Sequence, residues 1–244
     1  MKDIAHENIK NLTSLWEKVS ASFEGFNTKD EFNYTLVPNS DWPQKLWFTQ
    51  QPNEDSLSEA LKTLKASAND LSFSYWDDFN SPNYQMIETS GFSKKSEQVG
   101  MLLQFNQKIE SSNRLDFKRV SDKKEAHIWA EIYPQSFGYT ISSEILNRTK
   151  TEIEYYLAYF EGKAIGTAMV LLTGNVIGIH GVGVIPEMRK KGFAEEIMQF
   201  IINSAVDRNI GLATLQSSPM GKNIYLKMGF SEDFLMVNYK VPIV

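Results

Sequence analysis

The segment from Gly181 to Ala194 limits the fold of this chain more than any other stretch. It reads as a buried strand that stops at Pro186, followed by a basic turn with Gly192 that opens directly into a helix. The first backbone N–H groups of a helix have no partner within the helix and carry the positive end of its dipole. Because such a helix start binds phosphate groups, the segment predicts a pyrophosphate site between a strand and a helix.

The composition is that of a globular protein. Of the 244 residues, 42% are hydrophobic and 23% are charged, and the net charge is −5. A general nucleic-acid binder is usually basic, so we expect no nucleic-acid partner. We find no signal peptide at Met1–His6 and no run of the roughly 20 apolar residues that a membrane span needs. We therefore expect a cytoplasmic protein that does not contact membranes.

The residues available for catalysis are restricted. The chain has no cysteine, which excludes disulfides, a thiolate nucleophile and cysteine-ligated metals. Its three histidines, His6, His127 and His180, are far apart in the sequence, and none has a carboxylate partner at metal-ligand spacing. We therefore expect no metal.

Two blocks of predicted helices and strands indicate two domains. We place an N-terminal α+β domain at residues 1–105, a polar linker at 106–114 and a second domain at 115–244. The first block reads as a helix at 7–23, a strand at 46–49, a helix opened by a capping box at Ser56-x-x-Glu59, a strand at 71–76, a short helix from Asn80 to Gly91 and a strand at 98–105.

The second block predicts a central mixed sheet flanked by helices, which places the chain in the α+β, or mixed α/β, class. Its strands fall at 115–120, 155–160, 164–172, 176–185, 212–216 and 230–241, and its helices at 121–133, 190–207 and 220–228. Short turns join the three consecutive strands, so these should pair antiparallel. The strand–helix–strand unit from Val176 to Gln216 should form a right-handed parallel crossover.

Two motifs of the second block resemble those of the GNAT superfamily of N-acetyltransferases. Val184-x-Pro186-Glu187-x-Arg189-x-x-Gly192-x-Ala194 is similar to the family's acyl-CoA motif, Gln/Arg-x-x-Gly-x-Gly/Ala between a strand and a long helix. The segment Ser218–Phe230 is similar to the family's closing segment, which ends in Tyr-x-x-x-Gly-Phe. The resemblance covers about residues 115–241 and implies a GNAT-like sheet with acetyl-CoA as co-substrate.

The resemblance also implies which residues hold the co-substrate. The strand residues Val182, Gly183 and Val184 would bind the pantetheine arm through their backbone, and the turn residues Arg189, Lys190, Lys191, Gly192, Phe193 and Ala194 would bind the pyrophosphate. Gly192 lacks a Cβ, so the backbone can approach phosphate oxygens there. The alternatives are a solvated basic turn and, at Gly181 and Gly183, a strand bulge without a ligand.

His180 is our candidate general base. An ammonium group cannot attack a thioester, and an imidazole with a reference pKa of about 6.5 can take its proton at neutral pH. Alternation along the strand places His180 on the same face as Val182 and Val184. The alternative is a histidine that only shapes the cleft or is held by a neighbour.

Tyr225 and Ser218 belong to the closing segment. The resemblance implies that Tyr225 lies near the CoA sulfur and protonates the departing thiolate, although it could instead face the core. Ser218 stands where many members of the family have an Asn that contacts the CoA arm. Its hydroxyl could make that contact or cap the following helix.

The N-terminal block echoes the second one weakly. Tyr84 and Gly91-Phe92 resemble Tyr-x-x-x-Gly-Phe, although the tyrosine lies seven residues before the glycine instead of four. We hypothesise a degenerate, truncated GNAT-like half that pairs with the active one. The alternative is an unrelated α+β cap.

Together these features predict an N-acyltransferase. It would transfer the acetyl group of acetyl-CoA to a primary amine, on a small molecule or a peptide, by direct attack in a ternary complex without a metal. The alternatives are a non-catalytic acyl-CoA-binding or regulatory module and a tandem structural protein whose clefts its own side chains fill. The sequence does not identify the acceptor, and it leaves a homodimer open.

Overall fold

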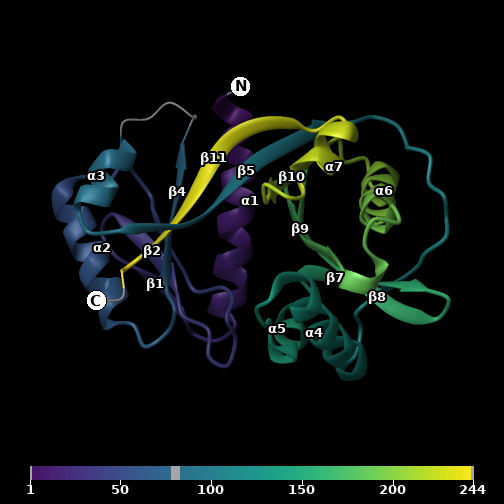
Figure 1. Cartoon of the computed structure of the whole chain (residues 1–244), viewed down its shortest axis with the longest axis horizontal. Helices are drawn as coiled ribbons and strands as arrows, with labels where there is room; N and C mark the ends of the chain where they lie inside the picture. The colour runs from purple at the N-terminus through teal and green to yellow at the C-terminus, as the bar shows by residue number, and fades with distance from the viewer. Residues whose placement is uncertain (1, 78–82, 243–244) are drawn as a thin grey trace.

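The computed structural model describes residues 2–77 and 83–242 of the chain (Figure 1). Their strands form one 11-stranded sheet in the order β1-β2-β3-β4-β11-β5-β10-β9-β8-β7-β6. Parallel and antiparallel pairs both occur in it, and helices flank it, so the predicted mixed α/β class is confirmed.

The elements divide into an N-terminal and a C-terminal half. The N-terminal half supplies α1 (Lys2–Ala21), β1 (Phe26–Thr28), β2 (Phe32–Thr35), β3 (Lys45–Phe48), α2 (Glu54–Ala66), β4 (Ser72–Asp77), α3 (Asn83–Thr89) and β5 (Ser93–Gln104). The C-terminal half supplies β6 (Asp116–Arg119), α4 (Lys123–Phe137), α5 (Ser143–Thr149), β7 (Ile153–Phe160), β8 (Lys163–Thr173), β9 (Val176–Val184), the 3₁₀ helix η1 (Pro186–Met188), α6 (Phe193–Asp207), β10 (Leu212–Ser217), α7 (Lys222–Lys227) and β11 (Ser231–Lys240).

The two halves repeat one order of elements. In the C-terminal half, β7, β8 and β9 pair antiparallel, and β9 then pairs parallel with β10 across α6. In the N-terminal half, β1, β2 and β3 pair antiparallel, and β3 pairs parallel with β4 across α2. Each half closes with a short helix and a long strand. This shared topology supports the hypothesis that the N-terminal half is a GNAT-like repeat.

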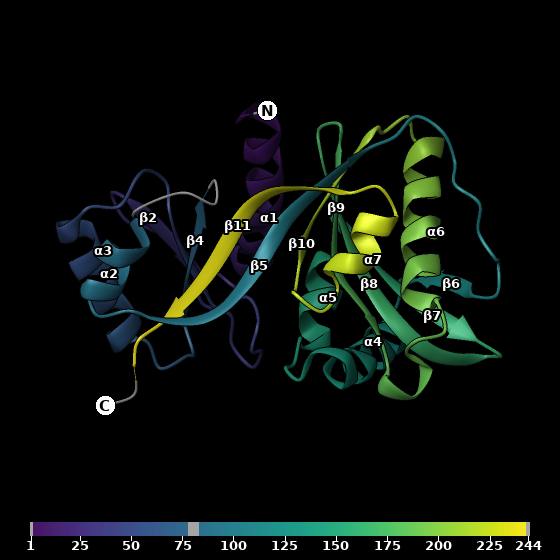
Figure 2. The same ribbon diagram turned by 45° about the horizontal axis from the view of Figure 1, so that its top comes forward.

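The closing strands are exchanged between the halves. Strand β5 pairs with β10 of the other half, and β11 pairs with β4, while β5 and β11 pair with each other at the centre of the sheet. Figures 1 and 2 show these two long strands running together from one half to the other. The predicted linker, residues 106–114, joins β5 to β6, and the sheet continues across this predicted boundary.

Two layers of helices cover the C-terminal part of the sheet. Successive residues of β7, such as Tyr155 and Tyr156, belong to two different hydrophobic clusters. The cluster of Tyr155 includes residues of α1, α4 and α5, and the cluster of Tyr156 includes residues of α6. Because side chains alternate along a strand, these two groups of helices pack on opposite faces. Across the described residues, no helix is both long and apolar enough to cross a membrane.

Several elements differ from the predictions. Helix α2 begins at Glu54 because Asn53 is its N-cap, and the capping box is formed by Asn53 and Ser56 and not by Ser56 and Glu59. Helix α6 begins at Phe193 and not at Lys190, as explained below. Helix α5 and strands β1 and β2 were not predicted. The predicted start of the short helix at Asn80 lies outside the described residues.

Candidate active site

The site opens where two parallel strands separate. Strand β9 pairs with β10 only from Val176 to Gly178, opposite Leu212 to Thr214. Beyond this point β9 continues to Val184 beside β8, and β10 continues to Ser217 beside β5, but β9 and β10 no longer pair with each other. The two parallel strands therefore separate after Gly178 and Thr214. Ligands of open α/β sheets bind beyond the carboxyl ends of the parallel strands, which is where this gap lies.

A β-bulge reshapes β9 beside the gap. Its pairing with β8 passes from Met169 opposite His180 to Thr167 opposite Gly183, so β9 contains one extra residue. Gly181 accommodates the bulge with φ of +57°, a conformation that residues with a Cβ rarely adopt. A Cβ at Gly181 would also lie 2.8 Å from the Met169 side chain.

The bulge corrects the predicted orientation of His180. Val182 and Val184 pack with Ile179 in the hydrophobic cluster under α6. His180 instead faces α1, where its ring meets Asn11. The prediction that His180 shares a face with Val182 and Val184 is wrong, because the extra residue in β9 inverts the alternation of side chains.

The turn after β9 holds an uncapped helix start. Lys190 and Gly192 both have positive φ, of 62° and 83°, and these reverse the chain so that α6 begins at Phe193. Among the described residues no side chain caps this helix, so the first N–H groups, from Phe193 and Ala194 onward, have no intrahelical partner. This is the geometry of an anion site.

The basic side chains of the turn differ in what they contact. Arg189 donates a hydrogen bond from Nε to the carbonyl of Val184 and another from Nη2 to the carbonyl of Ser136, both 3.2 Å long. The side chains of Lys190 and Lys191 are exposed. Phe193 is 3% exposed and packs into the core, so only its backbone is available to a ligand.

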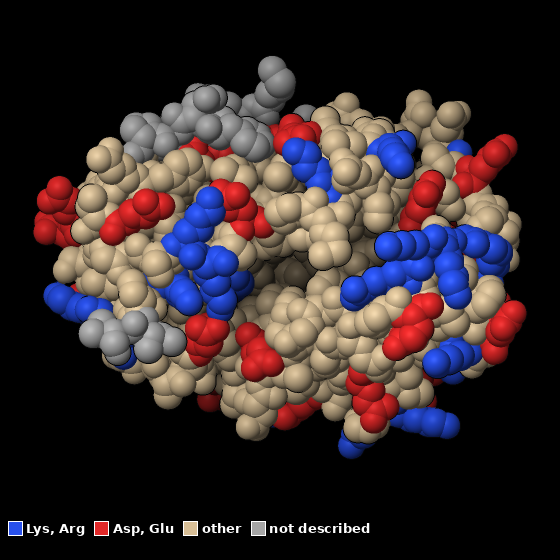
Figure 3. All heavy atoms as spheres, in the orientation of Figure 1, with Lys and Arg blue, Asp and Glu red and all other residues tan. Residues whose placement is uncertain are grey.

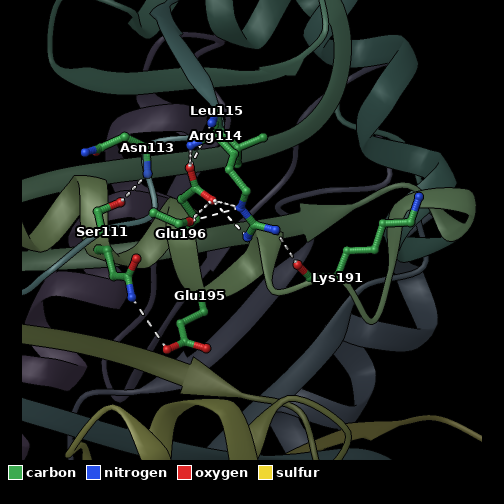
Figure 4. Close-up of polar contacts among 9 residues, drawn as sticks. Ser111, Asn113, Arg114, Leu115, Lys191, Glu195 and Glu196 are labelled. Atoms are coloured by element: carbon green, nitrogen blue, oxygen red, sulfur yellow. Dashed lines mark hydrogen bonds and ion pairs between the residues drawn. The ribbon is translucent and has the colours of Figure 1, made fainter.

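Figure 4 shows an ion pair beside the turn that the sequence analysis did not predict. Arg114, from the predicted linker, lies 3.0 Å from the buried carboxylate of Glu196 in the first turn of α6. Its Nη1 also donates to the carbonyl of Lys191 at 3.0 Å. Burial tends to raise the pKa of Glu196, but hydrogen bonds from Ser112, Leu115 and Arg114 outweigh it, so the pKa is lowered. Arg114 of the linker therefore contacts the chain both before the helix, at the carbonyl of Lys191, and in its first turn, at Glu196.

His180 is held in a buried polar network. Asn11 donates from Nδ2 to the carbonyl of Leu171 at 3.0 Å and to Thr173 Oγ1 at 2.8 Å, so its oxygen faces the ring. His180 Nε2 lies 3.0 Å from Asn11 Oδ1, and the network assigns the ring proton to this nitrogen. Sequence reasoning had no signal for Asn11, which lies 169 residues away in the chain.

Burial controls the titration of His180. Loss of solvent lowers the pKa of the imidazole to about 4, although an interaction with the Gln216 side chain acts in the opposite direction. The ring is therefore neutral at physiological pH. Gln216 is in turn fixed by a 2.7 Å hydrogen bond to Asn8 of α1. Among the described residues, no group of three or more His, Asp or Glu side chains could hold a metal ion.

Tyr225 and Ser218 lie on the opposite side of the gap. Burial raises the pKa of Tyr225 to about 12, so its hydroxyl stays protonated at neutral pH. Its ring packs edge-on against Phe230 with centroids 5.8 Å apart. Ser218 is exposed, and its Oγ accepts a 3.3 Å hydrogen bond from the N–H of Gly221 at the start of α7. Gly221 is itself the N-cap of α7, and no side chain caps that helix among the described residues, so the Ser218 hydroxyl supports the turn before the helix and does not cap it.

A cavity of 1010 Å³ connects these groups to the N-terminal half. Figure 3 shows it as a dark hollow at the centre of the molecule. It brings together the predicted residues His180, Tyr225, Val182, Ala194 and Ser218. The side chains of the basic turn lie outside its lining, and its far end is formed by residues of β3, β4, β5 and β11.

The arrangement defines a class of protein. A mixed sheet whose parallel strands separate beside an uncapped helix start is the fold of GNAT-type acyltransferases. Residues 121–230 match the model of the Acetyltransferase (GNAT) family. In its C-terminal half the chain is therefore a member of the GNAT superfamily, and this supports acyl transfer as its class of reaction.

Solved structures share the fold over most of the chain. A GCN5-related N-acetyltransferase from Kribbella flavida has a TM-score of 0.68 at 15% identity and covers 93% of this chain and 95% of its own. One from Sphaerobacter thermophilus has a TM-score of 0.66 at 16% identity, with 93% and 86% covered. A tandem GNAT protein from the clavulanic acid biosynthesis pathway has a TM-score of 0.61 at 9% identity, with 87% and 79% covered. A comparison with curated proteins gives no match.

Proposed function

We propose that this protein transfers the acetyl group of acetyl-CoA to a primary amine by direct attack in a ternary complex. The observation that carries the proposal is the gap between β9 and β10 beside the uncapped start of α6. Backbone groups line one side of this gap, and helix N–H groups lie at one end of it. A thioester on a long arm with a pyrophosphate fits such a site, because the arm pairs with strand backbone and the phosphates with helix N–H groups.

The donor would lie along β9 and the following turn. Val182, Gly183 and Val184 would pair with the pantetheine arm, because their strand has no β10 partner at that level. The N–H groups of Gly192, Phe193 and Ala194 would bind the pyrophosphate, and Lys190 and Lys191 would add attraction that salt screens. Arg189 would shape the turn through its two backbone contacts. Ser218 would contact the arm across the gap.

Tyr225 is the proposed general acid. It lines the cavity on the side opposite β9, and its hydroxyl stays protonated at neutral pH because burial raises its pKa to about 12. Proton transfer to the departing thiolate helps modestly, because a thiol with a pKa of about 8.5 is already a fair leaving group.

His180 remains the candidate base, directly or through a water molecule. Its neutral ring can accept a proton, and it lines the cavity. A pKa of about 4 makes it a weak base, however, because a general base works best with a pKa near the working pH. Its hydrogen bond to Asn11 supports a second role, in which the ring holds β9 against α1.

The test is thiol release from acetyl-CoA across a panel of primary amines. Turnover with at least one amine is expected. Tight binding of acetyl-CoA without turnover of any amine would favour a non-catalytic acyl-CoA-binding module. Absence of binding would contradict both and favour a structural tandem protein. In the variant His180→Ala, a wild-type kcat would remove the base assignment.

A further inference from the structure

The end of the cavity farthest from the strand gap contains an unusual lysine. Lys45, the first residue of β3, lines the cavity together with Asn238 of β11 and Trp16 of α1. Its ammonium lies 5.6 Å from the centre of the Trp16 ring. Burial lowers the pKa of Lys45 to about 8, with a smaller contribution from Lys95, so the group is still mostly protonated at neutral pH.

Lys45 is charged but forms no ion pair among the described residues, although the charge of Asp70, which pairs with Lys95, raises its pKa from a distance. Its Nζ donates to Ser72 Oγ at 3.2 Å and to Asn238 Oδ1 at 2.8 Å, and both acceptors are neutral. Among the described residues, no carboxylate forms an ion pair with it. Lys45 is only partly exposed, and a cation with reduced access to water is stabilised when an anion accompanies it.

The acidic groups around the cavity are already engaged. Asp70 pairs with Lys95, and Glu97 pairs with Lys94. Asp41 accepts hydrogen bonds from both the hydroxyl and the N–H of Thr140, which lower its pKa. Each of these carboxylates therefore has its own donors, and Lys45 is left as the cation that a ligand can neutralise.

We propose that Lys45 binds a carboxylate of the acceptor, so that the acceptor is an amine that also carries a carboxylate at the end remote from its amino group. This proposal rests on the proposed function. The amine must reach the acyl end of the gap near Tyr225, and the same cavity extends from there to Lys45. One unpaired lysine with neutral neighbours suits a single negative charge, whereas a phosphate dianion would need further donors.

The proposal is tested with matched ligands that differ in one group. The probes are ω-amino carboxylates of graded chain length and their amides, together with the N-acetylated product of each. The proteins are the full-length wild type, Lys45→Met, Lys45→Arg and the control Lys62→Met, whose lysine is exposed on α2 outside the cavity. Lys45→Met should fold, because Asn238 Oδ1 keeps its 2.7 Å hydrogen bond from Ser74 and Ser72 Oγ keeps the carbonyl of Gln44.

The first readout is calorimetric binding of the N-acetylated products to CoA-saturated protein. We expect the carboxylate of at least one chain length to bind about tenfold or more tightly than its amide. Lys45→Met should lose this preference, and Lys62→Met and Lys45→Arg should keep it. Equal affinity for carboxylate and amide in the wild type, binding of neither, or an unchanged preference in Lys45→Met would overturn the proposal.

The second readout is the pH dependence of the same preference. It should decline in the wild type as the pH rises above about 8, because Lys45 then loses its proton, and it should persist in Lys45→Arg, whose guanidinium stays charged. The neighbouring charges, Lys95 and Asp70, are unchanged in both proteins. Equal decline in the two proteins would contradict the assignment.

Thiol release separates this proposal from the proposed function. A carboxylate preference in binding without turnover of any amine would contradict acetyl transfer and leave the Lys45 site intact. Turnover of amides as fast as of carboxylates would contradict the Lys45 site and leave acetyl transfer intact.

Discussion

At the scale of single residues, the site depends on side chains whose charge is set by burial. His180 is kept neutral by burial, and burial also keeps Tyr225 protonated. Lys45 stays charged but without an anion. None of these states follows from residue type alone, because each depends on neighbours distant in the sequence. They lead to two predictions beyond the Lys45 experiment.

Stability should depend on the protonation of His180. Its folded-state pKa of about 4 lies below its ordinary value, so the unfolded state binds the proton more readily as the pH falls through 6.5 toward 4. The free energy of unfolding is therefore highest above about pH 6.5, where the ring is neutral in both states, and it falls as the pH drops from 6.5 toward 4. Between about pH 7 and about pH 5 the wild type should lose about 2 kcal/mol more than His180→Gln, whose amide can still donate to Asn11.

Urea unfolding at the two pH values gives this difference directly. The control His127→Gln alters an exposed histidine of α4 and should keep the wild-type pH dependence. If the free energy of unfolding falls equally in the wild type and in His180→Gln, the ring is not held neutral in the folded protein.

Removal of the Tyr225 hydroxyl should affect the chemical step and not donor binding. In Tyr225→Phe we expect kcat to fall about tenfold or more while the KM for acetyl-CoA changes little, because the hydroxyl would act only on the departing sulfur. The ring contact with Phe230 is retained in this variant. Steady-state thiol release measures both constants, and an unchanged kcat would remove the acid assignment.

At the scale of elements, the segment after β9 is the best predicted part of the chain. The strand, the Pro186 stop, the basic turn and the following helix were all predicted, because glycine, proline and apolar periodicity are local signals. The start of α6 was misplaced because Lys190 adopts positive φ, which a lysine rarely does. The orientation of His180 was wrong because a bulge changes the alternation without a unique sequence signal.

The Arg114–Glu196 pair could not be predicted for a similar reason. Arg114 lies in a segment that reads as a plain polar linker, and its contacts with Lys191 and Glu196 are 77 and 82 residues away. The one available signal is Glu196 itself, an acidic residue on the helix face of Phe193 and Ile197, where the structure leaves it 1% exposed. An acid at such a position requires a partner.

Loss of Arg114 should weaken donor binding. In Arg114→Ala the carbonyl of Lys191 loses its donor, and the charge of Glu196 is left uncompensated close to the proposed pyrophosphate site. We expect the KM for acetyl-CoA to rise about tenfold with kcat nearly unchanged. The matched control is Lys108→Ala, which removes an exposed ion pair with Asp207 at the other end of α6. Kinetics in which kcat falls and KM is unchanged would contradict this role.

At the scale of the whole molecule, the sequence predicted two blocks and a weak repeat, and the structure shows how they combine. The repeat was visible in the order of the elements and only faintly in residues such as Gly91-Phe92. The exchange of β5 and β11 was not predictable, because neither strand carries a signal for which neighbour it pairs with. Strand pairing across such distances is decided by the packing of the whole sheet.

The exchange predicts that the two halves stay together when the linker is cut. A protease site inserted between Gln107 and Lys108, where both side chains are exposed, should allow cleavage without separation, because β5 and β11 pair from Ser93 to Leu102. Size-exclusion chromatography of the cut protein should show one species with the mass of the whole chain. The halves expressed separately should each be poorly soluble, because each then lacks its central neighbour strand. Elution of two folded fragments would contradict a shared sheet.

The same exchange bears on how substrates enter. Enzymes with two lobes often close like a clamshell about a few flexible residues. In this protein, a rotation of one half against the other would have to disturb the hydrogen bonds that β11 makes with β4 and β5 over most of its length. The cavity between the two halves would therefore keep its width when the proposed substrates bind, and the proposed acceptor would be selected by whether its length spans that cavity.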